Sequence, residues 1–278
     1  MNLLKFYRFD VWIRNLGISL IGILSLSHIP NSLLALIPLI QLFLLQSYSF
    51  SMNNYEDFKF RKEKNYIAGL LKTGYDKKTI IFLCFLPLVI LMLTIIYFDG
   101  VFLLLLAYIV LFFLYDSPYV RLKKNWILSI IINSLCLALI LYIYPYMFFS
   151  STFTVLAITF SIIFFFYMAF HEMIHQLAHS RTEKILPKNL GMKGGVKVAQ
   201  FILLIPIISS IIAILLDPSL NIIFVITIAF SIFRIYNLSK IKLDPKTFEK
   251  IKYSWHKFYS AHEGILYALF LVFMNYPF

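Results

Sequence analysis

The sequence predicts an all-α integral membrane protein that forms a single domain over residues 1–278. Hydrophobic residues make up 61% of the chain and charged residues only 14%, and the mean hydropathy is +0.84. A soluble domain carries about 25% charged residues, so this chain has too little polar surface to cover a water-soluble protein. The composition therefore excludes a soluble enzyme, a disordered chain and a disulfide-rich scaffold.

Nine apolar runs approach the length of about 20 residues that a membrane-spanning helix needs. The predicted spans cover residues 12–29, 32–51, 79–98, 101–116, 125–144, 147–170, 197–216, 220–238 and 258–276. Because lipid offers no hydrogen-bond partner to an open backbone, the runs are expected to be helices packed in a bundle. Long polar loops after the second and sixth spans, four helices apart, indicate two similar halves around a central cavity.

The placement of lysine and arginine predicts the orientation of this bundle. All 25 basic residues fall at the N-terminus, near span ends on one side, or in alternate connections. These connections are the predicted cytoplasmic loops, at about residues 52–78, 117–124, 171–197 and 239–257. Basic residues favour the cytoplasmic side, so the N-terminus is predicted to be cytoplasmic and the C-terminus outside. Topology thus accounts for the net charge of +12, and no nucleic-acid partner is expected.

The first long loop begins with a polar run that could bind a cation and phosphate. Asn53, Asp57 and Arg61 are spaced i, i+4, i+8 and share one helical face. Carboxylate and amide oxygens arranged in this way hold a hard divalent cation such as Mg²⁺. Neighbouring bases, Lys64 among them, are suited to phosphate. The alternative is a solvated helix end whose positive charges only fix the orientation.

The second long loop begins with three of the six histidines of the chain. His171, His175 and His179 repeat at i, i+4, i+8, and such a row at a membrane boundary is expected to face a cavity or a ligand. Residues 171–175 also match the HExxH pattern of zinc proteases, with Glu172 as the base. An intramembrane zinc protease is therefore an alternative. Its third ligand would come from one of three candidates: His179, Glu183 or Asp57.

The exit of the fourth span reads YDSPYVRLKK over residues 115–124. Pro118 is expected to end the helix, and Arg121 and Lys123 are expected to direct two cations to the cytoplasmic face. Farther along the chain, Arg234 is predicted to extend to the cytoplasm. Glu263 is predicted to pack at the start of the last span.

Together, these three segments resemble the UbiA superfamily of intramembrane prenyltransferases. The first family motif, N-D-x-x-D-x-x-x-D, is matched by Asn53 and Asp57, with Glu56 as a substitute acid and Arg61 at the last acidic position. The fourth-helix motif, Y-x-x-P-P-x-R-x-K, is matched at Tyr115, Pro118, Arg121 and Lys123, with Tyr119 in place of the second proline. The tail ILPKNLG at 185–191 is similar to the T-L-P-x-x-L-G ending that follows the second motif.

The resemblance implies a site in which two aspartate-rich motifs hold Mg²⁺ on a polyprenyl diphosphate. Here His175 and His179 stand where aspartates of the second motif are expected, with His171 or Glu172 near the first position. Three outcomes are open: Mg²⁺ held by oxygens and water, a softer metal held by the histidines, or charge compensation without a metal. Arg61 in the place of an acid favours a reduced metal dependence.

The activity implied by the resemblance is ionisation of an isoprenoid diphosphate and transfer of the prenyl group to an aromatic or lipid-like acceptor in the cell membrane. The implied catalytic residues are Asp57, His175 and His179. The implied diphosphate-binding residues are Asn53, Asn54, Arg61, Lys64, Arg121 and Lys123. The implied metal ligands are Asp57, Glu56, His171, Glu172, His175 and His179. Alternatives are a terpene cyclase of the same superfamily and a non-catalytic member that binds a lipid or a partner.

Overall fold

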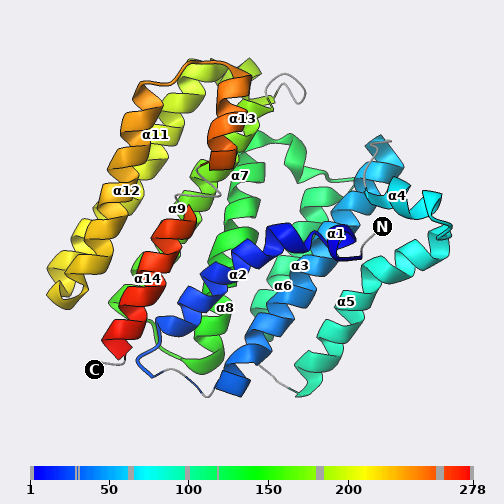
Figure 1. The fold of residues 1–278 in the computed structure, drawn as a ribbon, viewed down its shortest axis with the longest axis horizontal. Helices are drawn as coiled ribbons and strands as arrows, with labels where there is room; N and C mark the ends of the chain where they lie inside the picture. The colour runs from blue at the N-terminus through cyan, green and yellow to red at the C-terminus, as the bar shows by residue number, and fades with distance from the viewer. Residues whose placement is uncertain are drawn as a thin grey trace.

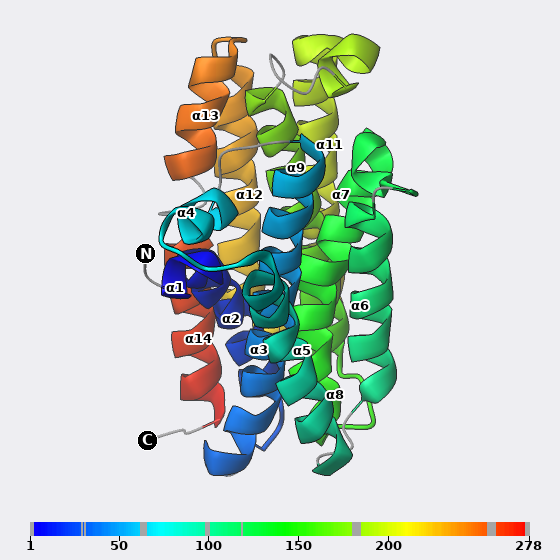
Figure 2. The ribbon, with the colours of Figure 1, turned by 90° about the vertical axis from the view of Figure 1, so that its right-hand side faces the viewer.

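The computed structural model describes residues 3–28, 30, 32–61, 66–97, 101–117, 119–179, 185–254 and 260–275, and the regular structure within these ranges is helical. Figures 1 and 2 show the long helices side by side along one direction. The longer helices are α2 (Phe9–Leu24), α3 (Ser32–Arg61), α5 (Lys77–Tyr97), α6 (Phe102–Asp116), α7 (Trp126–Ser134), α8 (Ile140–Phe149), α9 (Val155–Ala178), α11 (Ile185–Leu216), α12 (Asn221–Ser239), α13 (Pro245–Ser254) and α14 (Ser260–Asn275). Short elements are α1 (Leu3–Phe6), α4 (Tyr66–Lys72) and the 3₁₀ turns η1 (Leu122–Lys124) and η3 (Pro218–Leu220).

The protein is a multi-pass membrane protein, as the sequence predicts. Six helices in the described ranges are long and apolar enough to cross a membrane: Leu33–Phe60, Lys77–Ile95, Trp126–Phe149, Val155–Ala178, Leu190–Leu216 and Pro218–Ser239. Asn15–Leu24 and Phe102–Asp116 are shorter apolar helices. The count of nine spans and the orientation of the two termini stay predictions.

The boundary between the predicted fifth and sixth spans differs from the structure. The predicted break at residues 144–146 is helical, because α8 continues through Pro145 to Phe149. The chain instead leaves the helix at Ser150, and α9 begins where the Thr154 side chain accepts a hydrogen bond from the Ala157 N–H at 3.1 Å. A threonine that caps a helix was a stronger boundary signal than a proline inside an apolar run.

Both polar segments that follow spans belong to helices. Helix α3 extends for 30 residues to Arg61, and α9 extends for 24 residues to Ala178. The predicted loops at 52–78 and 171–197 therefore begin as helix ends. A side chain on a helix end has a more fixed direction than one on a loop. Residues spaced i and i+4 in these segments therefore lie on one face of the helix.

Close packing in the centre fixes how these helices lie against one another. Phe160 and Phe170 of α9 are fully buried. Helix α2 approaches α8 so closely that a Cβ atom on Gly22 would lie 2.4 Å from the carbonyl oxygen of Tyr142. Only glycine allows this contact. Helices α7 and α8 form one rod, interrupted by a π-helical turn (Leu135–Leu139).

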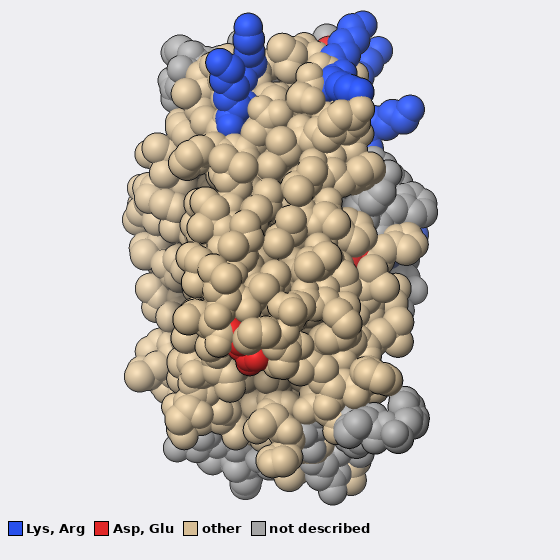
Figure 3. All heavy atoms as spheres, turned by 90° about the vertical axis from the view of Figure 1, so that its left-hand side faces the viewer, with Lys and Arg blue, Asp and Glu red and all other residues tan. Residues whose placement is uncertain are grey.

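Figure 3 shows the face on the α11 and α12 side of the bundle. On this face, lysine and arginine gather at one end, and a small acidic patch lies toward the other end of a surface made mostly of other residues. Large apolar side chains on α11 are exposed, among them Phe201 and Leu215 at 67% and 77%. Such exposure is unfavourable in water and suits a surface that faces lipid. The charge pattern on this face agrees with the one-sided distribution that the sequence predicts.

Candidate functional site

A lysine held by three oxygen atoms lies where α3, α6 and η1 meet. The Lys123 ammonium donates hydrogen bonds to Asn53 Oδ1 at 3.1 Å, Asp57 Oδ1 at 3.0 Å and Asp116 Oδ1 at 2.5 Å. The side chains of Lys123 and Asp116 are only 9% and 7% exposed. The structure therefore brings Lys123, after the exit of α6, to Asp57 and Asn53 of the first polar segment, 66 and 70 residues earlier. We call Asn53, Asp57, Asp116 and Lys123 the lysine cluster.

An unusual backbone turn directs Lys123 to this position. Arg121 adopts the left-handed conformation, with φ 46° and ψ 56°, and η1 begins directly after it. This conformation is uncommon for residues other than glycine and is found where the surrounding structure requires it. The turn reverses the chain after α6, so Lys123 reaches back to Asp116, seven residues earlier. Pro118, the predicted helix breaker, lies outside the described residues.

Hydrogen bonds connect the second polar segment, through α7, to the residue next to the lysine cluster. Ser129 of α7 donates its hydroxyl to Glu172 Oε1 of α9 at 3.1 Å. The Ser129 hydroxyl also lies 3.3 Å from the Tyr115 hydroxyl, which accepts from the Asn133 amide at 3.2 Å. Tyr115 directly precedes Asp116 on α6. Glu172 of the other polar segment is therefore linked through α7 to the residue beside Asp116.

The histidine row faces other neighbours. His171 Nε2 lies 3.1 Å from the Ser260 hydroxyl of α14. The rings of His175 and His179 lie 4.5 Å apart, and His179 Nε2 is 3.5 Å from the Lys252 ammonium of α13. The row thus packs toward α13 and α14, whereas Glu172 contacts α7. The residues of the predicted set that joins the histidines with Glu172 therefore have partners on three helices, α7, α13 and α14.

The donor atoms around Lys123 suit a hard divalent cation. No three histidine, cysteine, aspartate or glutamate side chains converge as a metal site within the described ranges. Glu56 Oε2 and Asp116 Oδ2, however, are buried and have no hydrogen-bond partner there. A buried carboxylate oxygen without a partner is costly, and Mg²⁺ takes such oxygens as ligands. The oxygen-rich lysine cluster therefore fits the Mg²⁺ implied by the family resemblance better than the histidine row does.

Three other residues implied by the resemblance are placed differently or lie outside the description. The Asn54 amide donates to the carbonyl oxygen of Phe6 at 3.5 Å, which ties α3 to α1. The Arg61 side chain and all of Lys64 lie outside the described residues, as does Glu183. Asp116 was missed in the sequence, where its only signal is an acid at the last position of an apolar span.

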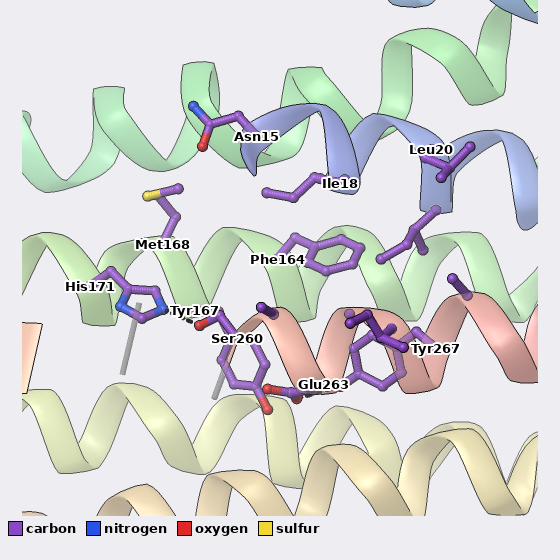
Figure 4. Close-up of a pocket in the computed structure, with 16 residues that line it drawn as sticks. Asn15, Ile18, Leu20, Phe164, Tyr167, Met168, His171, Ser260, Glu263 and Tyr267 are labelled. Carbon is purple, nitrogen blue, oxygen red and sulfur yellow. Dashed lines mark hydrogen bonds between the residues drawn. The ribbon is translucent and has the colours of Figure 1, made fainter. Parts of the chain in front are cut away.

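An apolar cavity of about 350 Å³ lies between α2, α9 and α14. Figure 4 shows His171 and Ser260 toward one end of the cavity and Leu20 and Tyr267 toward the other. Aromatic side chains form part of the wall: Phe164, Tyr167 and Tyr267. His171 borders the cavity, and the next residue, Glu172, is linked through Ser129 to Tyr115, which precedes Asp116 of the lysine cluster. Successive residues of α9 therefore border the cavity and begin the hydrogen-bond chain that leads to Tyr115.

A buried ion pair supports one wall of the cavity. Arg234 Nη2 of α12 lies 2.6 Å from Glu263 Oε2 of α14, and the two residues are 1% and 2% exposed. The Tyr267 hydroxyl donates to Glu263 Oε1 at 2.5 Å, and the guanidinium lies 4.5 Å from the centre of the Tyr167 ring. The interpretation that Arg234 extends to the cytoplasm is wrong, because its charge is paired inside the bundle.

The fold matches solved structures over nearly its whole length, at low identity. A UbiA homologue from Archaeoglobus fulgidus superposes with a TM-score of 0.76 at 15% identity, covering 98% of each chain. The same homologue bound to DMAPP and Mg²⁺ gives 0.71 at 15% identity, over 98% of this chain and 99% of that one. A structure of digeranylgeranylglyceryl phosphate synthase gives 0.72 at 15% identity, with the same coverage.

Comparison with curated proteins finds no match. A family model, in contrast, matches residues 16–260, which is most of the chain and includes the lysine cluster, the histidine row and the first residue of α14. The chain therefore belongs to the UbiA prenyltransferase family.

Proposed function

We propose that this protein is an intramembrane prenyltransferase that ionises an isoprenoid diphosphate and transfers the prenyl group to a hydrophobic acceptor. The observation that carries the proposal is the lysine cluster, in which one buried ammonium is held by oxygens from α3 and α6. A second observation supports it, because α9 borders an apolar cavity and is linked by hydrogen bonds, through Ser129 of α7, to Tyr115, the residue next to Asp116. A diphosphate with an apolar tail needs both a charged site and an apolar cavity.

In the proposed reaction, the bond between C1 of the prenyl chain and the diphosphate oxygen breaks, and the electron pair leaves with the diphosphate. Lys123 and Arg121 bind the negative charge of the leaving group. Asn53, Asp57 and Glu56 are the proposed Mg²⁺ ligands, and a bound Mg²⁺ would neutralise the charge that develops on the diphosphate. His175 and His179 are proposed to close the site on the side of α13.

The cavity is proposed to hold the prenyl chain. Its wall is mostly apolar, and the rings of Phe164, Tyr167 and Tyr267 can face a cation. Aromatic rings attract cations through their electron-rich faces, so they shield the allylic cation from water until the acceptor attacks C1. The acceptor then loses a proton when the new bond forms at a hydroxyl oxygen or an aromatic carbon.

The test is a reconstituted assay with prenyl diphosphates of several lengths and a lipid extract as the acceptor source. Pyrophosphate release and transfer of a radiolabelled prenyl group are both expected. Asp57→Asn is expected to reduce the rate by roughly 100-fold or more, because it removes a charged contact from the diphosphate site. Asp76→Asn, which changes an exposed carboxylate in the same way, is the matched control. A wild-type protein that releases no pyrophosphate from any prenyl diphosphate contradicts the proposal.

The aromatic wall also favours a second function, cyclisation of the prenyl chain. A carbocation that meets several rings can be passed along the chain before it loses a proton. Cyclisation would release pyrophosphate without an acceptor and would give a cyclic hydrocarbon. Mass spectrometry of the lipid extract distinguishes this product from a prenylated acceptor.

Gly264→Leu is expected to shorten the cavity. Gly264 lines the cavity on α14, and a Cβ atom added there meets no atom within 4 Å. The first side-chain atom of the leucine therefore enters open space without displacing backbone. Turnover of a twenty-carbon prenyl diphosphate is expected to fall roughly tenfold or more, while a five-carbon substrate changes little.

The control for this variant is Leu269→Phe, which adds bulk to the same helix at a side chain that is 62% exposed. It is expected to leave the chain-length preference unchanged. Equal losses for short and long substrates in Gly264→Leu would show that the prenyl chain does not occupy this cavity.

A further inference from the structure

The Lys123 ammonium occupies a position that oxygens surround in the manner of a metal site. Asp116, Asp57 and Asn53 each direct one side-chain oxygen at it, at 2.5, 3.0 and 3.1 Å. Mg²⁺ binds oxygens at about 2.0–2.1 Å. The same three oxygens would therefore need to move inward by about 1 Å or less to hold a magnesium ion in place of the ammonium.

The second carboxylate oxygen of Asp116 is not used by the Lys123 ammonium. The residue is only 7% exposed, and its Oδ2 atom is buried without a hydrogen-bond partner in the described ranges. Because Oδ1 of the same carboxylate binds Lys123, Oδ2 lies at the edge of the lysine cluster. A buried carboxylate is stable only when its charge and its oxygens are both compensated. Here the Lys123 ammonium compensates Oδ1, whereas Oδ2 has no hydrogen-bond partner in the described ranges.

The charge of the cluster points to a divalent ion. Two carboxylates, those of Asp57 and Asp116, face one ammonium, so the directly bonded set carries a net charge of −1. Such a set repels a diphosphate. Replacing the ammonium with a divalent cation makes the set neutral and releases a positive side chain that can bind phosphate.

The position of Asp116 also explains how a site could work when other acidic positions of the family motifs hold basic residues or histidines. Arg61 stands at the last acidic position of the first motif, and histidines stand in the second. Those histidines face α13 and α14. An acid from the exit of α6 supplies the missing oxygen ligand from a third segment of the chain.

We propose that Asp116, with Asp57 and Asn53, binds a divalent cation of the Mg²⁺ type in place of the Lys123 ammonium, and that Lys123 then turns to the diphosphate. The cation site stands independently of turnover, whereas the role of Lys123 on the diphosphate rests on the proposed function. The histidine row takes no part in this cation site.

Binding of Mn²⁺ to the protein in lipid nanodiscs tests the cation site without any reaction. The electron paramagnetic resonance signal of free Mn²⁺ reports how much ion is bound. Asp116→Asn, which keeps the shape of the side chain, is expected to weaken Mn²⁺ binding roughly tenfold or more. Asp116→Glu is expected to recover part of the affinity. Lys123→Met is expected to tighten Mn²⁺ binding, because it removes the ammonium that competes for the same oxygens.

Two controls accompany these variants: Asp76→Asn, which removes an exposed carboxylate, and the double variant His175→Ala, His179→Ala. Both are expected to bind Mn²⁺ as the wild type does. Unchanged affinity in Asp116→Asn, weaker binding in Lys123→Met, or loss of binding in the histidine double variant would each overturn the cation site. Inorganic pyrophosphate is expected to bind the Mn²⁺-loaded wild type at least tenfold more tightly than Mn²⁺-loaded Lys123→Met, and equal binding would overturn the role of Lys123.

These outcomes separate the cation site from the proposed function. A protein that binds Mn²⁺ through Asp116 but releases no pyrophosphate from prenyl diphosphates keeps the cation site and loses the prenyltransferase proposal. A protein that transfers prenyl groups with Asp116→Asn unchanged in Mn²⁺ affinity keeps the function and loses the cation site.

Discussion

Replacing Arg234 with methionine is expected to lower the free energy of unfolding by roughly 3–5 kcal/mol, the usual cost of leaving one partner of a buried ion pair alone. Glu263 is 2% exposed and depends on Arg234 and Tyr267 for its hydrogen bonds. Without the guanidinium, its carboxylate stays buried beside an apolar cavity. Circular dichroism of the protein in mixed micelles, with increasing fractions of a denaturing detergent, measures the change.

The double variant Arg234→Met, Glu263→Gln separates the loss of the pair from the loss of packing. Removing the charge of both partners is expected to recover much of the stability, because no unpaired charge then remains in the bundle. The matched control is Arg121→Met, which removes an arginine that is only partly buried, at the end of the bundle. Equal stability of Arg234→Met and the wild type would show that the pair does not hold α12 to α14.

Lys123→Met is expected to reduce pyrophosphate release from a prenyl diphosphate by roughly 100- to 1,000-fold, the usual effect of removing one preorganised contact to a developing charge. Methionine keeps most of the length of the side chain but has no charge and no donor. Lys123→Arg is expected to retain part of the activity, because it keeps the charge with a different geometry.

The control for this prediction is the next residue in the chain. Lys124→Met changes the net charge by the same amount, but Lys124 is exposed and lies at the end of η1. It is expected to have near-normal activity. If both variants lost activity equally, the effect would come from the general charge at this end of the protein and not from the lysine cluster.

Composition and spacing were enough to predict the membrane class and the family resemblance. Apolar runs identify helices because their length must match the bilayer, and the spacing of Asn53 and Asp57 predicted one helix face. In the structure, the side chains of both residues accept hydrogen bonds from one ammonium. That ammonium belongs to Lys123, which the sequence also marked as a site residue.

Contacts between distant segments could not be predicted in the same way. Asp116 looked like the end of an apolar run, and its role depends on a left-handed turn at Arg121 that no local pattern requires. Arg234 looked like a residue near a span end. Its partner Glu263 lies 29 residues away on another helix, and only the packing of α12 against α14 brings the two together.

The π-helical turn at Leu135–Leu139 sets the relative rotation of the two halves of the α7–α8 rod. One half presents Ser129 to Glu172, and the other presents Tyr142 to Gly22. Each residue of an α-helix advances the rotation by about 100°, so deleting one residue from the wide turn would swing one half by about a quarter of a circle. The rod would lose only about 1.5 Å of its length and would keep its apolar exterior, but Ser129 and Tyr142 could no longer both face their partners. The π-helical turn therefore fixes the rotation about the helix axis that aligns these side chains with their partners. Hydropathy does not record this rotation.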